Sequence, residues 1–441
     1  MKLRTYIFSM LAAGALFACS SDDINIDKPS ALQPDAYLSL NVKDNSNSIL
    51  AKSGQTEADK QDVIKDLTVA VFDNSDKLHA IKKAGTDAVE VTLIPVKSGT
   101  LKVLALVNVL DKLTETEKAM FDAIPEGGSS YTLNDFVALT TSLEKEENGY
   151  LTMSSAVISI VTEADHNNCL GYSLTQIEDK ETTYNPSPVK DLNLTHSNAE
   201  ITREGIKVYR TPSRVTLSKL TVLQDTDFGR VVGFKLDSVF MASVKASSNI
   251  ASTSSAGWNV VEKATDFTWF DGAAGSVTGK LKTHVNDEAD NKGFLLQEHN
   301  TIYPFAFTSF GGASYKSEEF DYFFYVYENG QVANDGDKTL LVVRGDYTYI
   351  PQGFENDPEP PTITVEDGYW VVTVNDGVNV SFGQGTPEHK YVKRNMVYDI
   401  QATVVGPGSK GEFDPEARTH LAAKVVVADW NLVNMGEVVV D

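Results

Sequence analysis

Short runs in which apolar and polar residues alternate recur along most of this chain of 441 residues. The segment 66–73 is typical, because Leu67, Val69 and Val71 fall on one face of an extended strand. Asn-Gly and Asp-Gly pairs, which favour tight turns, punctuate several of these runs. Short strands at this spacing predict a mainly β protein built from sandwiches. The polar stretch 162–198 is instead predicted to form loops and insertions.

The length of the chain suits two domains of about 200 residues, each large enough to bury a core. We expect the first β-sandwich domain at 37–208 and the second at 209–441. Helix signals are confined to the first domain. Thr114 with Glu117 three residues later is a capping box that predicts a short helix, and a second helix is predicted over 134–144.

The first residues have the features of an export signal. A basic start precedes an apolar run from Tyr6 to Ala18, which is well short of the ~20 residues that span a bilayer. The run ends in Leu-Phe-Ala-Cys, the pattern that a bacterial lipoprotein signal peptidase cuts. We therefore expect a signal peptide at 1–18, cleavage between Ala18 and Cys19, and acyl chains on Cys19 that hold the mature chain at a membrane surface. Residues 19–36 then form a flexible tether.

The first predicted strand is followed by an unusually long polar loop. Leu38, Leu40 and Val42 fall on one face at a period of two, which predicts a short half-buried strand. The loop that follows, 43–62, is long for a compact domain. Lys52 lies in the middle of this loop, where a trypsin-like protease could cut.

The net charge and the cysteine count limit the partners and the covalent cross-links that this chain can have. The formal net charge of −23 is spread along the chain and argues against nucleic acid or an anionic membrane as a partner. Cys169 is the only cysteine besides Cys19, so a lipidated Cys19 leaves no intrachain disulfide.

No motif in the sequence predicts catalysis, a cofactor or a bound metal. The tripeptide Arg344-Gly345-Asp346, which some cell-surface receptors bind, falls inside a predicted strand, and Asn334–Asp337 is interpreted as a hairpin turn rather than a calcium loop. No two histidines have metal-ligand spacing: His79, His166, His196, His284, His299, His389 and His420. The dispersed tryptophans are interpreted as core residues rather than a sugar-stacking platform: Trp258, Trp269, Trp370 and Trp430.

Several runs, in consistent order over much of the chain, resemble the fimbrillin family of Bacteroidetes, the fimbrial subunits that build type V pili. The resemblance implies two tandem antiparallel β-sandwich domains of the transthyretin-like type. The runs are LTMSSA (151–156), VYRTPSRVTL (208–217), FFYVYEN (323–329), TLLVVRGDY (339–347), KRNMVYDI (393–400), VVGPGS (404–409) and VVVADWNLVNMGEVVV (425–440).

The resemblance also implies a route of assembly. Family members are exported as lipoproteins, and a trypsin-like protease cuts the loop after the first strand. That strand leaves, and a strand from the C-terminal region of another subunit fills the groove, with main-chain hydrogen bonds supplying affinity. Here the displaced strand would carry Leu38, Leu40 and Val42, and the candidate donor residues are Val425, Val427, Val438 and Val440.

The implied partners are other copies of the chain, accessory fimbrial subunits, the maturation protease and, through lipid, the outer membrane. One departure from the family matters, because its stalk subunits are usually cut after arginine and no arginine lies between Arg4 and Arg203. We therefore expect cleavage between Lys52 and Ser53. The alternatives are an uncleaved fimbrial anchor or accessory subunit and a monomeric glycan-binding surface lipoprotein, while an enzyme such as a glycosidase has the least support.

Overall fold

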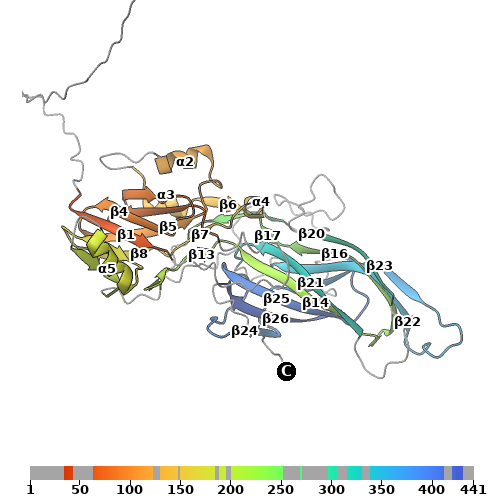
Figure 1. Ribbon diagram of the computed structural model, residues 1–441. Helices are drawn as coiled ribbons and strands as arrows, with labels where there is room; N and C mark the ends of the chain where they lie inside the picture. Colours follow the sequence, from red (N-terminus) through yellow and green to blue (C-terminus); the bar gives the residue numbers. More distant parts are fainter. Residues whose placement is uncertain are drawn as a thin grey trace, which may run out of the picture.

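β-strands dominate the structure, a computed structural model, and the predicted mainly β class is confirmed (Figure 1). In the described part of the chain, no helix is both long and apolar enough to cross a membrane. The structure describes residues 34–42, 63–122, 130–147, 149–183, 188–194, 200–251, 269–270, 296–304, 315–329, 338–411 and 420–430.

The first half of the chain contains two sheets. One has the strand order β10-β9-β1-β4, in which β1 is antiparallel to β4 and parallel to β9. Its strands are β1 (Ala36–Asn41), β4 (Glu90–Val96), β9 (Asn167–Leu170) and β10 (Val189–Asp191). The other has the order β13-β7-β5-β2-β3, and β8 also pairs with β5. Its strands are β2 (Leu67–Phe72), β3 (Leu78–Lys83), β5 (Gly99–Val107), β7 (Met153–Ser154), β8 (Ile158–Thr162) and β13 (Tyr209–Arg210).

A single core fills the space between these two sheets. Leu38 and Leu40 of β1 pack in the same cluster as Val69 of β2 and Val103 of β5. The opposite faces of β2 and β5 are also buried, as Leu104 shows. The nearly continuous apolar run of β5 is typical of a central strand, and β5 pairs with β2 on one edge and with β7 and β8 on the other.

Short helices cover the outer faces of this first sandwich. Helices α2 (Glu115–Asp122) and α3 (Leu133–Val137) contribute Phe121 and Phe136 to the apolar cluster over the second sheet, while α5 (Leu174–Thr183) packs Ile177 against the first sheet. Figure 1 shows α2 and α3 on one side and α5 on the other. The predicted Thr114 capping box is confirmed, because Thr114 N donates to Glu117 Oε2 (2.7 Å) and Glu117 N donates to Thr114 Oγ1 (3.3 Å).

The second half repeats the arrangement with longer strands. One sheet has the order β21-β14-β25-β26-β24, and the other has the order β15-β16-β22-β23 with β20 also paired to β16. Alternate residues of both sheets, among them Val215, Leu236, Val343, Ile400 and Val427, share one core. The strands are β14 (Ser213–Val222), β15 (Asp225–Thr226), β16 (Gly229–Ala242), β20 (Leu296–Pro304), β21 (Tyr315–Val326), β22 (Leu340–Pro351), β23 (Ile363–Thr373), β24 (Val380–Phe382), β25 (Met396–Val404) and β26 (Leu421–Asp429).

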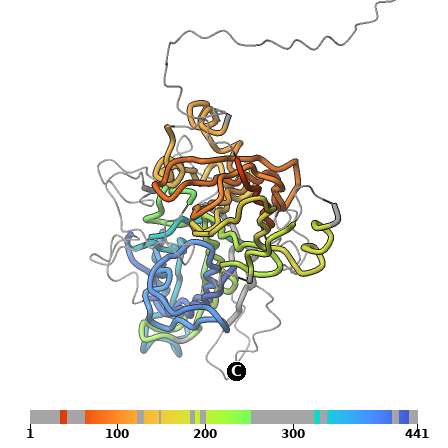
Figure 2. The backbone as a smooth tube through the Cα atoms, turned by 90° about the vertical axis from the view of Figure 1, so that its left-hand side faces the viewer, coloured from red at the N-terminus to blue at the C-terminus, as the bar shows by residue number. Residues whose placement is uncertain are grey.

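Small strand pairs complete the fold and join the two halves. The pair β6 (Thr140–Ser142) and β18 (Ser247–Asn249) is antiparallel and connects a first-half segment to a second-half one. The remaining pairs are β11 (Ile201–Thr202) with β12 (Gly205–Ile206), and β17 (Val244–Lys245) with β19 (Trp269–Phe270). Figure 1 shows the two halves side by side, and Figure 2 views the molecule from the end that the first half forms.

The sheets are mixed rather than purely antiparallel. β14 is parallel to β25 and β24 is parallel to β26, while the other pairs in that sheet are antiparallel. A strand that returns from the opposite sheet can enter in either direction, so the alternation of the sequence does not fix the pairing sense.

Two sequence predictions for the first half are wrong. The predicted helix over 134–144 is broken, because α3 ends at Val137 and β6 separates it from α4 (Leu143–Glu147). The Thr-Thr-Ser run of β6 pairs with β18, and this tertiary contact outweighs helix propensity. The stretch 162–198, predicted as loops, contains β9, α5, β10 and the 3₁₀ turn η1 (Leu192–Leu194).

Candidate functional site

The first strand, β1, lies between β9 and β4 in its sheet. We call the place that β1 occupies between these two strands the slot. Tyr37 pairs with Pro95 of β4 on one side and with Asn167 of β9 on the other. Val42, just beyond the strand, donates its N–H to Val89 O (2.8 Å) and makes a parallel bridge with Ile206. Removal of β1 would therefore uncover backbone groups of both β4 and β9.

One face of β1 lies in the first hydrophobic core. Leu38 and Leu40 are fully buried, and Ala36 and Val42 are each only 1% exposed. Full burial of a leucine side chain stabilises a fold by roughly 1.5–3 kcal/mol. This face therefore contributes strongly to holding β1 in its sheet.

The opposite face of β1 is buried as well, so the predicted half-buried strand is wrong on this point. Ser39 is 0% exposed and Asn41 is 7% exposed. The helix α5 lies on this side of the sheet. Its Ile177 packs with Cys169 of β9, the register partner of Ser39, and its Lys180 pairs with Glu90 of β4, the register partner of Asn41. Alternation predicted the core face correctly, but the sequence does not show that a helix from the predicted loop region covers the polar face.

Hydrogen bonds, rather than apolar contacts, hold this second face. Ser39 Oγ donates to Asn167 Oδ1 (2.8 Å) and accepts from Leu93 N (3.0 Å). Asn41 Nδ2 donates to Gly171 O (3.0 Å). Gly171 has φ 80°, and a Cβ there would collide with Asn41 O, so only glycine permits this close approach.

The start of β1 is fixed at the surface. Asp35 Oδ1 accepts from Ser98 N (2.5 Å) and Asp35 Oδ2 accepts from Ser98 Oγ (3.0 Å). The backbone hydrogen bond from Ser98 lowers the pKa of Asp35 below its usual value.

The residues predicted for lipidation and cleavage lie outside the described part of the chain: Ala18, Cys19, Lys52 and Ser53.

The candidate donor residues divide into two groups. Val425 and Val427 belong to β26, which pairs with β25 on one side and β24 on the other, and they are 2% and 0% exposed in the second core. Donation of β26 would therefore open the second sandwich. Val438 and Val440 lie outside the described residues.

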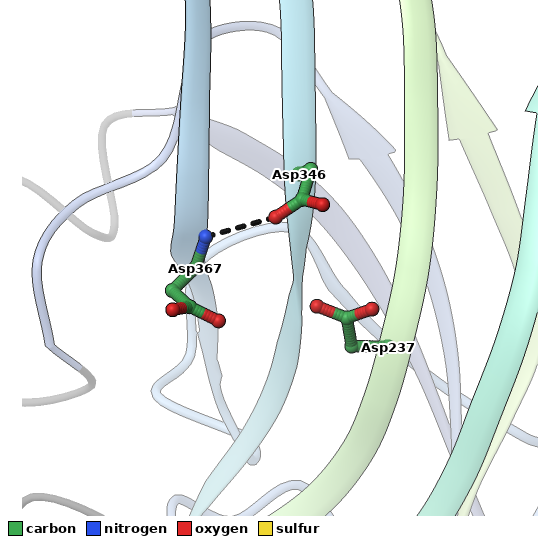
Figure 3. Close-up of side chains that lie close together, drawn as sticks. All are labelled: Asp237, Asp346 and Asp367. Carbon is green, nitrogen blue, oxygen red and sulfur yellow. Dashed lines mark hydrogen bonds between the residues drawn. The ribbon is translucent and has the colours of Figure 1, made fainter.

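A carboxylate trio in the second half offers a different candidate site. Oxygens of Asp237, Asp346 and Asp367 lie within 4.8 Å of one another (Figure 3). Lys235 Nζ lies 2.6 Å from Asp237 and 3.7 Å from Asp346, and Arg344 lies 2.5 Å from Asp367. The positive charges of Lys235 and Arg344 thus balance much of the negative charge of the three carboxylates. Ion pairs of this kind are ordinary features of strand surfaces.

The Arg-Gly-Asp tripeptide is part of this ion-pair network and lies within β22, as predicted. Gly345 faces the backbone of β16, and a Cβ there would collide with Lys235 O. The close approach of two strands therefore explains the glycine, and the neighbouring ion pairs explain the arginine and the aspartate.

A shallow groove of about 510 Å³ lies over β14, β24, β25 and β26. It is lined by Lys219, Thr221, Asn379, Val380, Ser381, Gln401, Ala402, Thr403, Ala422, Ala423 and Lys424. Neither Trp370 nor Trp430 lines this groove, because both are buried in the second core, as predicted. The groove thus offers amide, hydroxyl and amine groups rather than an aromatic stacking surface.

Comparisons with known proteins show which family this chain resembles. The family described as "Major fimbrial subunit protein (FimA)" matches residues 36–203, from the first residue of β1. The major fimbrium subunit FimA type-2 of Porphyromonas gingivalis is 25% identical over 450 residues, which is 98% of this chain and 98% of that protein. The resemblance to the fimbrillin family is confirmed.

Solved structures share the fimbrillin fold. A crystal structure of a protein described as a cell adhesion protein from Parabacteroides distasonis has a TM-score of 0.59 at 24% identity, covering 90% of this chain and 99% of that one. A fimbrilin (FimA) from P. gingivalis has a TM-score of 0.54 at 17% identity, covering 91% and 99%.

Sequence reasoning missed the strand β9 and the helix α5, which lie beside β1. A signal for α5 was present, because Ser173 with Gln176 forms another capping box. Ser173 N donates to Gln176 Oε1 (2.9 Å) and Gln176 N donates to Ser173 Oγ (3.2 Å). It marks the start of α5, the helix that closes the polar face of β1.

Proposed function

We propose that this fimbrillin-family chain is a structural, non-catalytic subunit of a surface fimbria. It is exported as a lipoprotein on Cys19, cut after Lys52, and polymerised by exchange of β1 for a strand of another copy. The fibre supports adhesion at the cell surface. The two sandwiches act as domains that meet near residue 209.

The observation that carries the proposal is the interior position of β1. An interior strand that leaves opens an apolar groove and two unpaired strand edges, which is strongly unfavourable in water. A strand from a second subunit removes both penalties at once, and this couples removal of β1 to assembly. The partners are other copies of the chain and accessory fimbrial subunits.

The C-terminal segment after β26 is the preferred donor in this proposal. Val425 and Val427 fill the second core and pair on both sides, so their donation would sacrifice one sandwich to complete another. Residues 431–441 carry Val438 and Val440 at a strand period and follow shortly after β26. Their donation would leave Val425 and Val427 in the second core.

The first test is the intact mass and N-terminal sequence of protein from sheared surface filaments. The Lys52→Gln variant is compared with Lys60→Gln, a matched change in the same polar loop. We expect the wild type and Lys60→Gln to begin at Ser53 and to form SDS-resistant ladders, and Lys52→Gln to remain monomeric. A lipidated start at Cys19 with monomers only would contradict polymerisation and favour an anchor subunit or a glycan-binding lipoprotein.

A further inference from the structure

We propose that the groove over β14, β24, β25 and β26 is a binding site for a short acidic saccharide, whose carboxylates pair with Lys219 and Lys424. The four strands are neighbours in one sheet of the second half (Figure 1). The site belongs to the intact monomer and needs no exchange of β1, so this inference goes beyond the proposed function.

Two lysines and a glutamine form a row across this sheet. Lys219 of β14 pairs in register with Gln401 of β25, which in turn pairs with Lys424 of β26. Their chain neighbours lie in the second core: Leu220, Ile400 and Val425. Successive side chains point to opposite faces of a strand, so the row lies on the outer face. The Cα atoms of the two lysines are roughly 10 Å apart, because two strand spacings separate them.

A β-bulge in β14 sets the direction of Lys219. The register of β14 against β25 shifts between Leu217 and Lys219, so Ser218 is an additional residue in β14. Leu217 and Leu220 both lie in the second core. Strict alternation from Leu217 would have turned residue 219 into the core and residue 220 outward. The bulge reverses this order and brings Lys219 into the row on the outer face.

Both lysines are available to an anion. None of the ion pairs among the described residues includes Lys219 or Lys424. The preceding outward residue of β25, Asp399, interacts electrostatically with Arg214. Salt screens charges beyond about 10 Å, so the two local lysines outweigh the distant carboxylates of this acidic chain when the ligand is small. A long polyanion would meet those carboxylates, which limits the ligand to a short one.

The lining of the groove favours a saccharide over a peptide. Five of its side chains can both donate and accept hydrogen bonds, as sugar hydroxyls do: Thr221, Asn379, Ser381, Gln401 and Thr403. A peptide added as a strand would pair with the edge of the sheet at β24, whereas Lys219 belongs to β14, three strands away. A ligand that reaches both lysines must instead cross the face of the strands, where side chains supply the contacts. Its carboxylates would form charge-assisted hydrogen bonds with the lysines, in place of aromatic stacking.

The test uses the full chain in a Cys19→Ser background and measures binding of trigalacturonic acid, a carboxylated trisaccharide, by calorimetry at low salt. Its methyl ester is the matched neutral ligand and should bind at least tenfold more weakly. We expect Lys219→Gln and Lys424→Gln each to weaken binding of the acid about fivefold. Lys410→Gln is the matched control, because Lys410 is an exposed lysine of the same half outside the groove, and it should change the affinity less than twofold.

Two further variants separate a built site from simple attraction to positive charge. Gln401→Leu keeps both lysines and should still weaken binding about fivefold, because it removes the amide between them. Glu319→Gln, at the register partner of Lys219 in β21, should strengthen binding.

Three results would overturn the inference. The first is equal affinity, or no affinity, for the acid and its methyl ester. The second is unchanged affinity in both lysine variants. The third is tighter binding of hexaglutamate than of the saccharide, which would assign the groove to an acidic peptide. Because the uncleaved monomer is used, each of these results leaves strand exchange standing.

Discussion

His389 illustrates how a single residue couples this fold to pH. Its Nδ1 lies 2.9 Å from Pro387 O and its Nε2 lies 2.9 Å from the Tyr398 hydroxyl. These contacts fit a neutral ring that donates through Nδ1 and accepts through Nε2. Burial lowers the pKa of His389 to about 4. Protonation would remove this acceptor and leave the Tyr398 hydroxyl with the Tyr391 carbonyl (3.2 Å) as its acceptor.

The first prediction concerns stability in acid. The unfolded chain binds a proton at His389 near pH 6.5, whereas the folded chain does so only near pH 4, so the free energy of unfolding falls as pH drops between these values. We expect this histidine to account for about 2 kcal/mol of that loss, since its side chain is partly exposed. Urea unfolding at pH 7.0 and 4.5 measures it in the wild type and in His389→Gln. Parallel losses in the two proteins would contradict the prediction.

At the scale of the element, β1 and α5 enclose Cys169 of β9, which carries the only thiol in the described residues. Cys169 is 0% exposed, pairs in register with Ser39 and packs beneath α5. Burial raises its pKa to about 12, so very little thiolate exists near neutral pH. The thiol is expected to be inert while β1 is in place.

The second prediction uses this thiol to report the state of the slot. In a Cys19→Ser background, Cys169 is the sole cysteine. After cleavage in the 43–62 loop and removal of β1, we expect Ellman's reagent to react at least tenfold faster than with the intact chain, because water reaches β9 and the pKa of the thiol falls. Refilling the slot with a peptide copying 34–42 should restore slow reaction. An unchanged rate in the emptied slot would show that α5 alone protects the thiol.

At the scale of the molecule, a buried ion pair ties the two halves together. Arg394 lies 2.7 Å from Glu328, with side chains only 1% and 0% exposed. Arg394 also donates to the carbonyls of Asn249 and Ile250, and Ile250 packs in the apolar cluster over the first half. Burial would raise the pKa of Glu328, but the cations of Arg394 and Lys245 more than offset this, so its pKa lies below the usual value.

The third prediction is that Glu328→Gln destabilises the whole chain by about 3 kcal/mol, because it leaves the Arg394 charge buried without its counter-ion. Asp87→Asn, which breaks the exposed pair with Lys65, is the matched control and should cost less than about 1 kcal/mol. Thermal and urea unfolding measure both variants. Similar small losses would mean that the junction does not depend on this charge pair.

The sequence by itself determined the mainly β class, the central position of β5 and the core face of β1, because alternation and continuous apolar runs report burial directly. It also carried runs that resemble the fimbrillin family, and the comparisons confirmed this resemblance. Local capping chemistry at Thr114 and Glu117 was sufficient to predict α2.

Only the tertiary structure decided what surrounds these elements. The neighbours of β1, its cover by α5, and the bulge of β4 that binds Ser39 depend on residues about fifty or more positions away, and no local pattern encodes such pairings. The same holds for β6, where pairing with β18 overrode a predicted helix. Local periodicity sets which face of a strand is apolar, but the partner that covers the other face is chosen by the packing of the whole chain.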